Sequence, residues 1–201
     1  MKITFLGHAT LEIQINEFNL LVDPFISGNP MASEINLDDL KPDFILISHA
    51  HQDHTLDVEK LAKDNNSLII SNFEIVSHFQ SKGLNGHPMN HGGKWNFDFG
   101  ELKYVNAIHT STFPDGSNGG QPGGFIITSN NKSIYIAGDT ALTYDMKLIP
   151  INYNLDLAIL PIGDNFTMGY KDAMIASDFI ECNKILGYHS VSYTHLRAHE
   201  T

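Results

Sequence analysis

The chain has 201 residues, 42% of them hydrophobic, a length that suits one domain with a large core and is short for two. Its formal net charge of −11 makes nucleic acid an unlikely partner, because a phosphate backbone needs clustered Lys and Arg. No apolar run is long enough to span a bilayer and no signal peptide opens the chain, so we expect a cytoplasmic protein without a membrane contact.

The first half of the chain predicts a sheet followed by alternating helices and strands. Residues 2–6, 11–15 and 19–22 are short strand-like runs typical of antiparallel pairs, and an apolar run follows at 44–47. Residues 57–63 predict a helix with Asp57 as a candidate N-cap, 67–71 a strand, and 74–81 a helix ended by Gly83. We expect His87 and His91 to lie in a loop around Pro88.

The second half predicts two hairpins and a further strand, helix and strand. Residues 95–108 would turn near Gly100, and residues 124–136 at Asn130-Asn131. Residues 155–161 predict a buried strand, 184–188 a short one, and 172–184 a helix that contains the only cysteine, Cys182, which we expect in the core. Two such halves stack naturally into two sheets covered by helices.

A glycine-rich segment separates these hairpins. Five glycines occur among the eleven residues 114–124, which is too permissive for the interior of a helix or strand. The segment fits a lid over a substrate and fits a surface hairpin equally well.

The segment His49-Ala50-His51-Gln52-Asp53-His54 packs four side chains that can bind metal into six residues. His49 and His51 are two apart, so an extended chain points both imidazoles to the same side. Asp53 continues this alternation and His54 breaks it, so a turn here would let neighbouring side chains serve two adjacent ions. Imidazole and carboxylate ligands without thiolates suit an open, catalytic zinc site, with Mn or Fe as alternatives.

Three more candidate ligands follow strand-like runs elsewhere in the chain: His109, Asp139 and His189. Side chains at strand ends converge when the strands share one sheet edge. Taken singly, a His or Asp in such a place often caps a turn or bonds the backbone. Taken together with the histidine-rich segment, they indicate a metal centre.

These motifs together resemble the metallo-β-lactamase superfamily of binuclear metal hydrolases. Within it, the segments 7–10 (GHAT), 22–26 (VDPFI), 96–100 (NFDFG) and 161–169 (PIGDNFTMG) are similar to the UPF0173 group of metal-dependent hydrolases, relatives of the L-ascorbate-6-phosphate lactonases. The resemblance spans residues 1–189. It implies an α/β fold, a four-layer αββα sandwich in which two mixed β-sheets are flanked by helices.

The resemblance also implies a role for each candidate ligand. One ion would be held by His49, His51 and His109, and the other by Asp53, His54 and His189, with Asp139 bridging both. His8 is similar to the family's pattern and is placed near the metals, as a residue that supports a ligand or contacts substrate. From their place after a buried strand, Asp164 and Asn165 are candidates for the same roles, or for capping the next helix.

The predicted activity follows from the chemistry of bound divalent metal. Such an ion lowers the pKa of its water from about 15.7 to about 7, so a metal-bound hydroxide can serve as the nucleophile at neutral pH. Asp53, as a catalytic residue, would orient this nucleophile or relay a proton to the leaving group. We therefore expect a hydrolase with two divalent ions, zinc foremost, that cleaves a small ester, lactone or phosphoester.

Two alternatives remain at this stage. One is an iron-dependent oxidoreductase of the same fold, which is disfavoured because the diiron members tend to carry Glu where His51 stands. The other is a metal-binding domain without turnover. The sequence leaves the substrate's identity and a homo-oligomeric state open.

The end of the chain departs from the family's pattern. Where an aromatic-rich HYxTF-type stretch and more residues are expected, residues 190–201 read SVSYTHLRAHET. We expect a C-terminally incomplete hydrolase domain over residues 1–189 and a non-native tail over 190–201.

Overall fold

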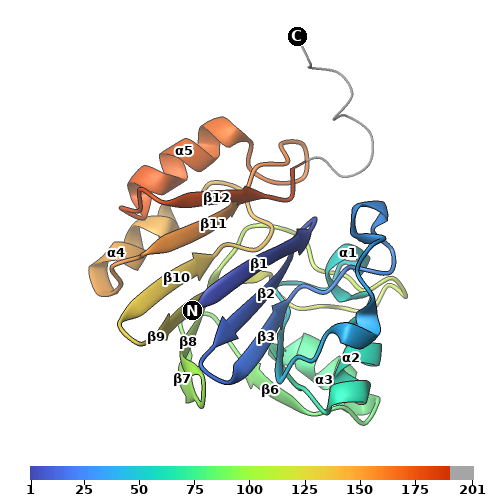
Figure 1. The fold of residues 1–201 in the computed structure, drawn as a ribbon. Coiled ribbons are helices and arrows are strands. Elements are labelled where there is room, and N and C mark those ends of the chain that lie inside the picture. Colours follow the sequence, from blue (N-terminus) through green and yellow to red (C-terminus); the bar gives the residue numbers. More distant parts are fainter. Residues whose placement is uncertain (191–201) are drawn as a thin grey trace.

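The computed structural model describes residues 1–190, which form two six-stranded sheets packed face to face between layers of helices (Figure 1). The predicted αββα sandwich is therefore confirmed. Of the tail expected at 190–201, all but Ser190 lies outside the described residues. Within residues 1–190, no helix is long and apolar enough to cross a bilayer.

The first sheet has three antiparallel strands followed by three parallel ones. The antiparallel strands are β1 (Lys2–Gly7), β2 (Thr10–Ile15) and β3 (Phe18–Val22), as the sequence predicts. The parallel strands are β4 (Phe44–Leu46), β5 (Leu68–Asn72) and β6 (Gly86–Met89), and the sheet order follows the chain order.

The second sheet has the order β12-β11-β10-β9-β8-β7. The strands β7 (Lys94–Phe97), β8 (Gly100–Asn106), β9 (Gly123–Ser129) and β10 (Lys132–Ile136) pair antiparallel. The strands β11 (Leu157–Pro161) and β12 (Ile185–Tyr188) then add in parallel. The turn between β9 and β10 falls at Asn130 and Asn131, whose φ angles of 52° and 59° suit a two-residue hairpin turn.

Helices cover the outer face of each sheet (Figure 1). Those of the first half are α1 (Gln52–Thr55), α2 (Val58–Asn65) and α3 (Phe73–Ser81), with short 3₁₀ turns η1 (Pro30–Ala32) and η2 (Leu37–Asp39). Those of the second half are η3 (Tyr144–Leu148), α4 (Ile149–Asn152) and α5 (Tyr170–Phe179).

Alternation along the strands divides the apolar residues among three cores. In β10, Ile134 and Ile136 enter the core between the sheets, whereas Tyr135 points to the opposite face and packs beneath η3 and α4. On the other side, Leu21 and Ile45 pack with Leu61 of α2. The four layers are therefore held by one central and two outer apolar cores.

The expected loop around Pro88 is instead the strand β6. Proline lacks the N–H that a central strand would donate, so the local sequence favours a loop. In this fold β6 is the outermost strand of its sheet, beyond β5, and an edge position tolerates proline.

The helix expected over 172–184 ends earlier, at Phe179. Glu181 takes a left-handed φ of 52°, and the N–H of Cys182 donates to the carbonyl of Ser177 at 3.1 Å. This is the hydrogen bond of a Schellman termination, which usually needs a glycine that is missing here. Cys182 is buried as expected, but it follows the helix.

Asp57 precedes α2 as predicted, yet its side chain makes no capping hydrogen bond to that helix. Its buried carboxylate accepts hydrogen bonds from the backbone N–H of Ile26 at 2.6 Å and of Ser27 at 3.0 Å, and from the Ser27 hydroxyl. Asp57 therefore ties the loop after β3 to the start of α2.

We expect Asp57→Ala to lower the free energy of unfolding by about 2 kcal/mol, because the buried N–H of Ile26 and the N–H of Ser27 lose a charged acceptor. Urea unfolding in the presence of a chelator measures this without a contribution from bound metal. Asp64→Ala is the matched control, since its pair with Lys60 is exposed and its loss should change stability by less than about 0.5 kcal/mol. Equal effects of the two substitutions would contradict the role given to Asp57.

Candidate metal centre

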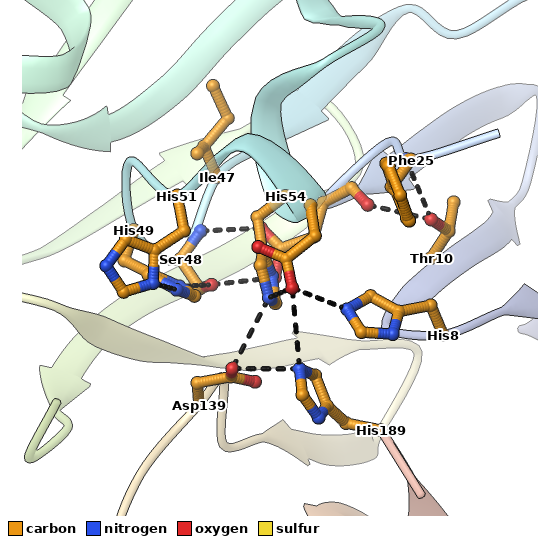
Figure 2. Close-up of polar contacts among 12 residues, drawn as sticks. His8, Thr10, Phe25, Ile47, Ser48, His49, His51, His54, Asp139 and His189 are labelled. Carbon is orange, nitrogen blue, oxygen red and sulfur yellow. Dashed lines mark hydrogen bonds and ion pairs between the residues drawn. The ribbon is translucent and has the colours of Figure 1, made fainter. Parts of the chain in front are cut away.

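The predicted ligands meet at one end of the sandwich, where strands of both sheets finish. Figure 2 shows five of them, His49, His51, His54, Asp139 and His189, close together. His8 follows β1, and the histidine-rich segment follows β4. In the second sheet, His109 follows β8, Asp139 follows β10, and His189 follows β12. Residues from all parts of the described chain thus lie at one shared edge.

The first set of ligands, the three-histidine group, comprises His49, His51 and His109. Each has a nitrogen within 4.8 Å of a nitrogen of the other two. Nε2 of His49 lies 2.9 Å from Nδ1 of His51, and the ring of His109 faces both at centroid distances of 4.9 and 5.0 Å. His51 has an extended backbone, and α1 begins directly after it.

The second set, the Asp53 group, comprises Asp53, His54 and His189. Oδ2 of Asp53 lies 3.8 Å from Nε2 of His54 and 3.9 Å from Nε2 of His189. His8 belongs to the same cluster: its Nε2 lies 2.8 Å from the same carboxylate oxygen, and the donor atoms of all four residues lie within 4.8 Å of one another. Figure 2 shows His8, His54 and His189 directed toward one another.

Asp139 lies between the two groups. Its Oδ2 is 3.0 Å from Nε2 of His189, 3.4 Å from Nε2 of His54, and 3.8 Å from Nε2 of His109. It also forms a possible metal-binding set with His49 and His54. Asp139 therefore has carboxylate oxygens within reach of both groups.

Asp23 is a site residue that the sequence analysis did not single out. Its fully buried carboxylate accepts hydrogen bonds from the backbone N–H and hydroxyl of Ser48, both at 2.7 Å, and from Nδ1 of His54 at 3.0 Å. The Ser48 oxygen in turn accepts from Nδ1 of His49 at 2.9 Å. Both imidazoles are thereby oriented with Nε2 directed toward the other candidate ligands, where it can bind a metal. The sequence signals were its place after the apolar strand β3 and its position in the segment 22–26 (VDPFI), whose resemblance to the UPF0173 group assigned Asp23 no role.

The buried polar atoms of the cluster fit a bound cation. Within residues 1–190, Asp139 Oδ1 and His189 Nδ1 make no hydrogen bond, and the Nε2 atoms of His54 and His189 have only ion-pair contacts with Asp139 and Asp53, although buried polar atoms normally have a hydrogen-bond partner. Each unpartnered atom costs about 1–3 kcal/mol. Imidazole nitrogens and carboxylate oxygens are also the donors that Zn²⁺, Mn²⁺ and iron accept.

The electrostatics of the two groups differ. Burial lowers the pKa of His49, His51 and His109, so these imidazoles are neutral near pH 7, in the form that binds metal. Burial also lowers the pKa of His189, but the carboxylates of Asp139 and Asp53 outweigh it and raise the pKa to about 9. The Asp53 group therefore attracts positive charge, which a divalent cation supplies as well as a proton does.

The carboxylates of the centre are ionised. Burial raises the pKa of Asp139, but His54 and His189 outweigh it and hold the pKa well below its usual value. Burial likewise opposes ionisation of Asp53, whereas His189 and His8 lower its pKa. Two anionic oxygen donors are thus available among the imidazoles.

The glycine-rich segment is anchored next to the three-histidine group. The Asn72 side chain donates to the carbonyls of Gly119 at 2.7 Å and Gln121 at 3.0 Å. A Cβ at Gly119 would come within 2.2 Å of the Ala50 side chain, so only glycine fits there. Part of the segment thus packs directly on the residue between His49 and His51.

Asp164 and Asn165 are not brought into the cluster. Both are exposed, and the Asp164 carboxylate lies against Gly169, the residue that precedes α5. The backbone of Gly163 is the part of this loop that approaches the centre, since a Cβ there would meet the His189 carbonyl at 2.4 Å.

Known proteins to which this chain is similar include metal-dependent and metallo hydrolases, and the matching family model is described as a beta-lactamase superfamily domain. A family model described as the beta-lactamase superfamily domain matches residues 2–189. UPF0173 metal-dependent hydrolases of Flavobacterium johnsoniae and Christiangramia forsetii are 66% and 63% identical over 189 and 190 residues, each covering 94% of this chain and 84% of the relative. A solved metallo hydrolase from Ignicoccus hospitalis superposes with a TM-score of 0.85 at 29% identity, covering 95% of this chain and 83% of that one.

We expect Asp23→Asn to weaken metal binding by roughly 10- to 100-fold, because an amide cannot accept from Ser48 and His54 as a carboxylate does. Calorimetric titration of the chelator-treated protein with Zn²⁺ measures this. Asp43→Asn is the matched control. Asp43 also accepts a hydrogen bond from a backbone N–H, that of Asn19 at 2.8 Å, but its side chain is exposed and lies outside the candidate metal centre. Unchanged zinc affinity in Asp23→Asn would refute the orienting role.

Proposed function

Since the chain belongs to the UPF0173 group of metal-dependent hydrolases, within the beta-lactamase superfamily, we propose that it uses two divalent metal ions, zinc foremost, to hydrolyse a small ester, lactone or phosphoester. One observation carries this proposal. Two groups of metal-competent side chains lie side by side, with Asp139 within 4 Å of members of both.

In this proposal the three-histidine group holds one ion, the Asp53 group holds the other, and Asp139 contacts both. The distances among the donor atoms and the unpartnered nitrogens of His54 and His189 support this division. Divalent ions bound here would supply Lewis acidity and a water of lowered pKa.

The protein's own contribution is to orient the reactants. The Asp53 carboxylate is ionised, and 36% of its side chain is exposed, so its oxygens are accessible to a water and a substrate as well as to the cluster. As a hydrogen-bond acceptor it would hold the attacking water and then pass a proton toward the leaving group. The buried His49 and His54 would instead keep the ligand geometry fixed.

We expect protein purified without chelator to contain about two metal ions per chain, and His51→Ala to lose about one of them, because the three-histidine group keeps only two imidazoles. Mass spectrometry of metals, normalised to protein concentration, checks this. His87→Ala, an imidazole on β6, should keep both ions. A metal-free protein from the unaltered chain would refute the proposal.

We expect Asp53→Asn to lower kcat by roughly 100- to 10,000-fold while the protein stays folded, because an amide cannot accept a proton. The assay is a panel of one chromogenic ester, one lactone and one phosphodiester, with metal content and circular dichroism recorded for each variant. Asp172→Asn, on the exposed face of α5, should leave kcat unchanged. An unaltered rate in Asp53→Asn would remove the catalytic assignment.

A further inference from the structure

His8 occupies the point where the edge strands of the two sheets meet. It follows β1 in a tight turn in which Gly7 and His8 have φ angles of 106° and 54°. The backbone carbonyl of His8 accepts a hydrogen bond from the N–H of His189 at 2.9 Å. A residue near the start of the chain thereby fixes the backbone of a ligand that follows β12.

The His8 side chain reaches a second ligand. Its Nε2 lies 2.8 Å from Oδ2 of Asp53, and because an ionised carboxylate only accepts, this nitrogen must carry the proton and donate. The ring packs on that of His189 at a centroid distance of 4.1 Å and against Phe25 at 5.4 Å. Only 6% of the side chain is exposed, so the ring is held in place by these contacts.

Asp53 needs such a partner more than the other ligands do. It lies on α1, a helix of only four residues, and its side chain is 36% exposed, whereas those of His54 and Asp139 are buried. Its neighbours in the cluster, His54 and His189, are 3.8 and 3.9 Å away, too far for a hydrogen bond. His8 is thus the contact that directs the Asp53 carboxylate toward the other ligands.

We propose that His8 is a positioning residue for the second metal ion: it orients Asp53 through its side chain and His189 through its backbone. The proposal rests on the two-ion function above. The three-histidine group is supported differently, by Ser48 against His49 and by Thr110, whose hydroxyl lies 3.2 Å from Nε2 of His51. Loss of the His8 side chain should therefore affect the second ion and spare the first.

His8 acts in this proposal as a donor and not as a ligand. Its Nε2 could bind a metal only by giving up the proton that it shares with Asp53. A side-chain amide separates the two roles, because it donates a hydrogen bond well and binds zinc poorly.

Two substitutions at this position give a matched pair. Glutamine places an N–H at nearly the reach of Nε2 and so can still donate to Asp53. Asparagine is too short to do so, but it tolerates the left-handed φ of 54° at least as well as histidine. Any loss seen with His8→Asn and not with His8→Gln is therefore due to the missing contact and not to the backbone.

The experiment is a titration of chelator-treated protein with Zn²⁺ by calorimetry, repeated with Co²⁺ so that the absorption spectrum reports each step of filling. In the unaltered chain we expect two binding steps. In His8→Asn we expect the second step to weaken by roughly 10- to 100-fold with the first unchanged, and in His8→Gln we expect the second step to recover. His87→Gln should match the unaltered chain throughout.

Four results would overturn the inference. Two unchanged steps in His8→Asn would show that Asp53 needs no such support. An equal loss in His8→Asn and His8→Gln would make the imidazole itself a ligand. Fewer than two steps in the unaltered chain would contradict the proposed two-ion function, and the inference would fail with it. Thermal unfolding of the metal-free variants shows whether a weakened step comes from general destabilisation, which would also count against the inference.

Discussion

The buried carboxylate of Asp23 is the constraint on which the rest of the centre depends. It follows β3 with a left-handed φ of 46°, and it accepts hydrogen bonds from Ser48 after β4 and from His54 on α1. A buried charge is tolerable only when it is fully hydrogen-bonded, so these contacts are obligatory once Asp23 is enclosed. They fix which nitrogen of His49 and His54 carries a proton. The other nitrogen of each ring is consequently directed into the cluster.

The sandwich brings the two halves of the centre together. Polar side chains follow strands of both sheets at the same end of the sandwich. The central core of apolar residues between the sheets sets how closely the two sheets approach there. The backbone hydrogen bond from His189 to His8 closes the gap between the outer strands β12 and β1. Asp139, which follows β10, then reaches the imidazoles that follow β4. A shared ligand is thus a product of sheet packing and not of any local segment.

The candidate metal centre holds buried polar groups that lack full hydrogen bonding. Ring nitrogens of His54 and His189 lie beside ionised carboxylates without full hydrogen bonding, in a protein whose three cores consist of apolar side chains. Such groups weaken the folded state unless something binds them. The surrounding sheets supply the stability that allows the arrangement, and the glycine at position 119 lets the neighbouring loop pack against Ala50 without displacing the histidines.

The sequence by itself determined the local parts of this protein. The spacing of His49, His51 and Asp53, the Asn130-Asn131 turn and the alternating strands are short-range patterns, and each was predictable because the backbone geometry of a few residues decides it. Only the tertiary structure decided the role of Asp23, which bonds His54 across 31 positions, and the strand β6, whose Pro88 is acceptable only at a sheet edge. Likewise, the early end of α5 depends on Glu181 adopting a conformation that its residue type does not favour. The convergence of His109, Asp139 and His189 on the histidine-rich segment was expected from their strand ends and the family resemblance, but the individual hydrogen bonds between distant residues arise from packing, and a linear pattern does not encode them.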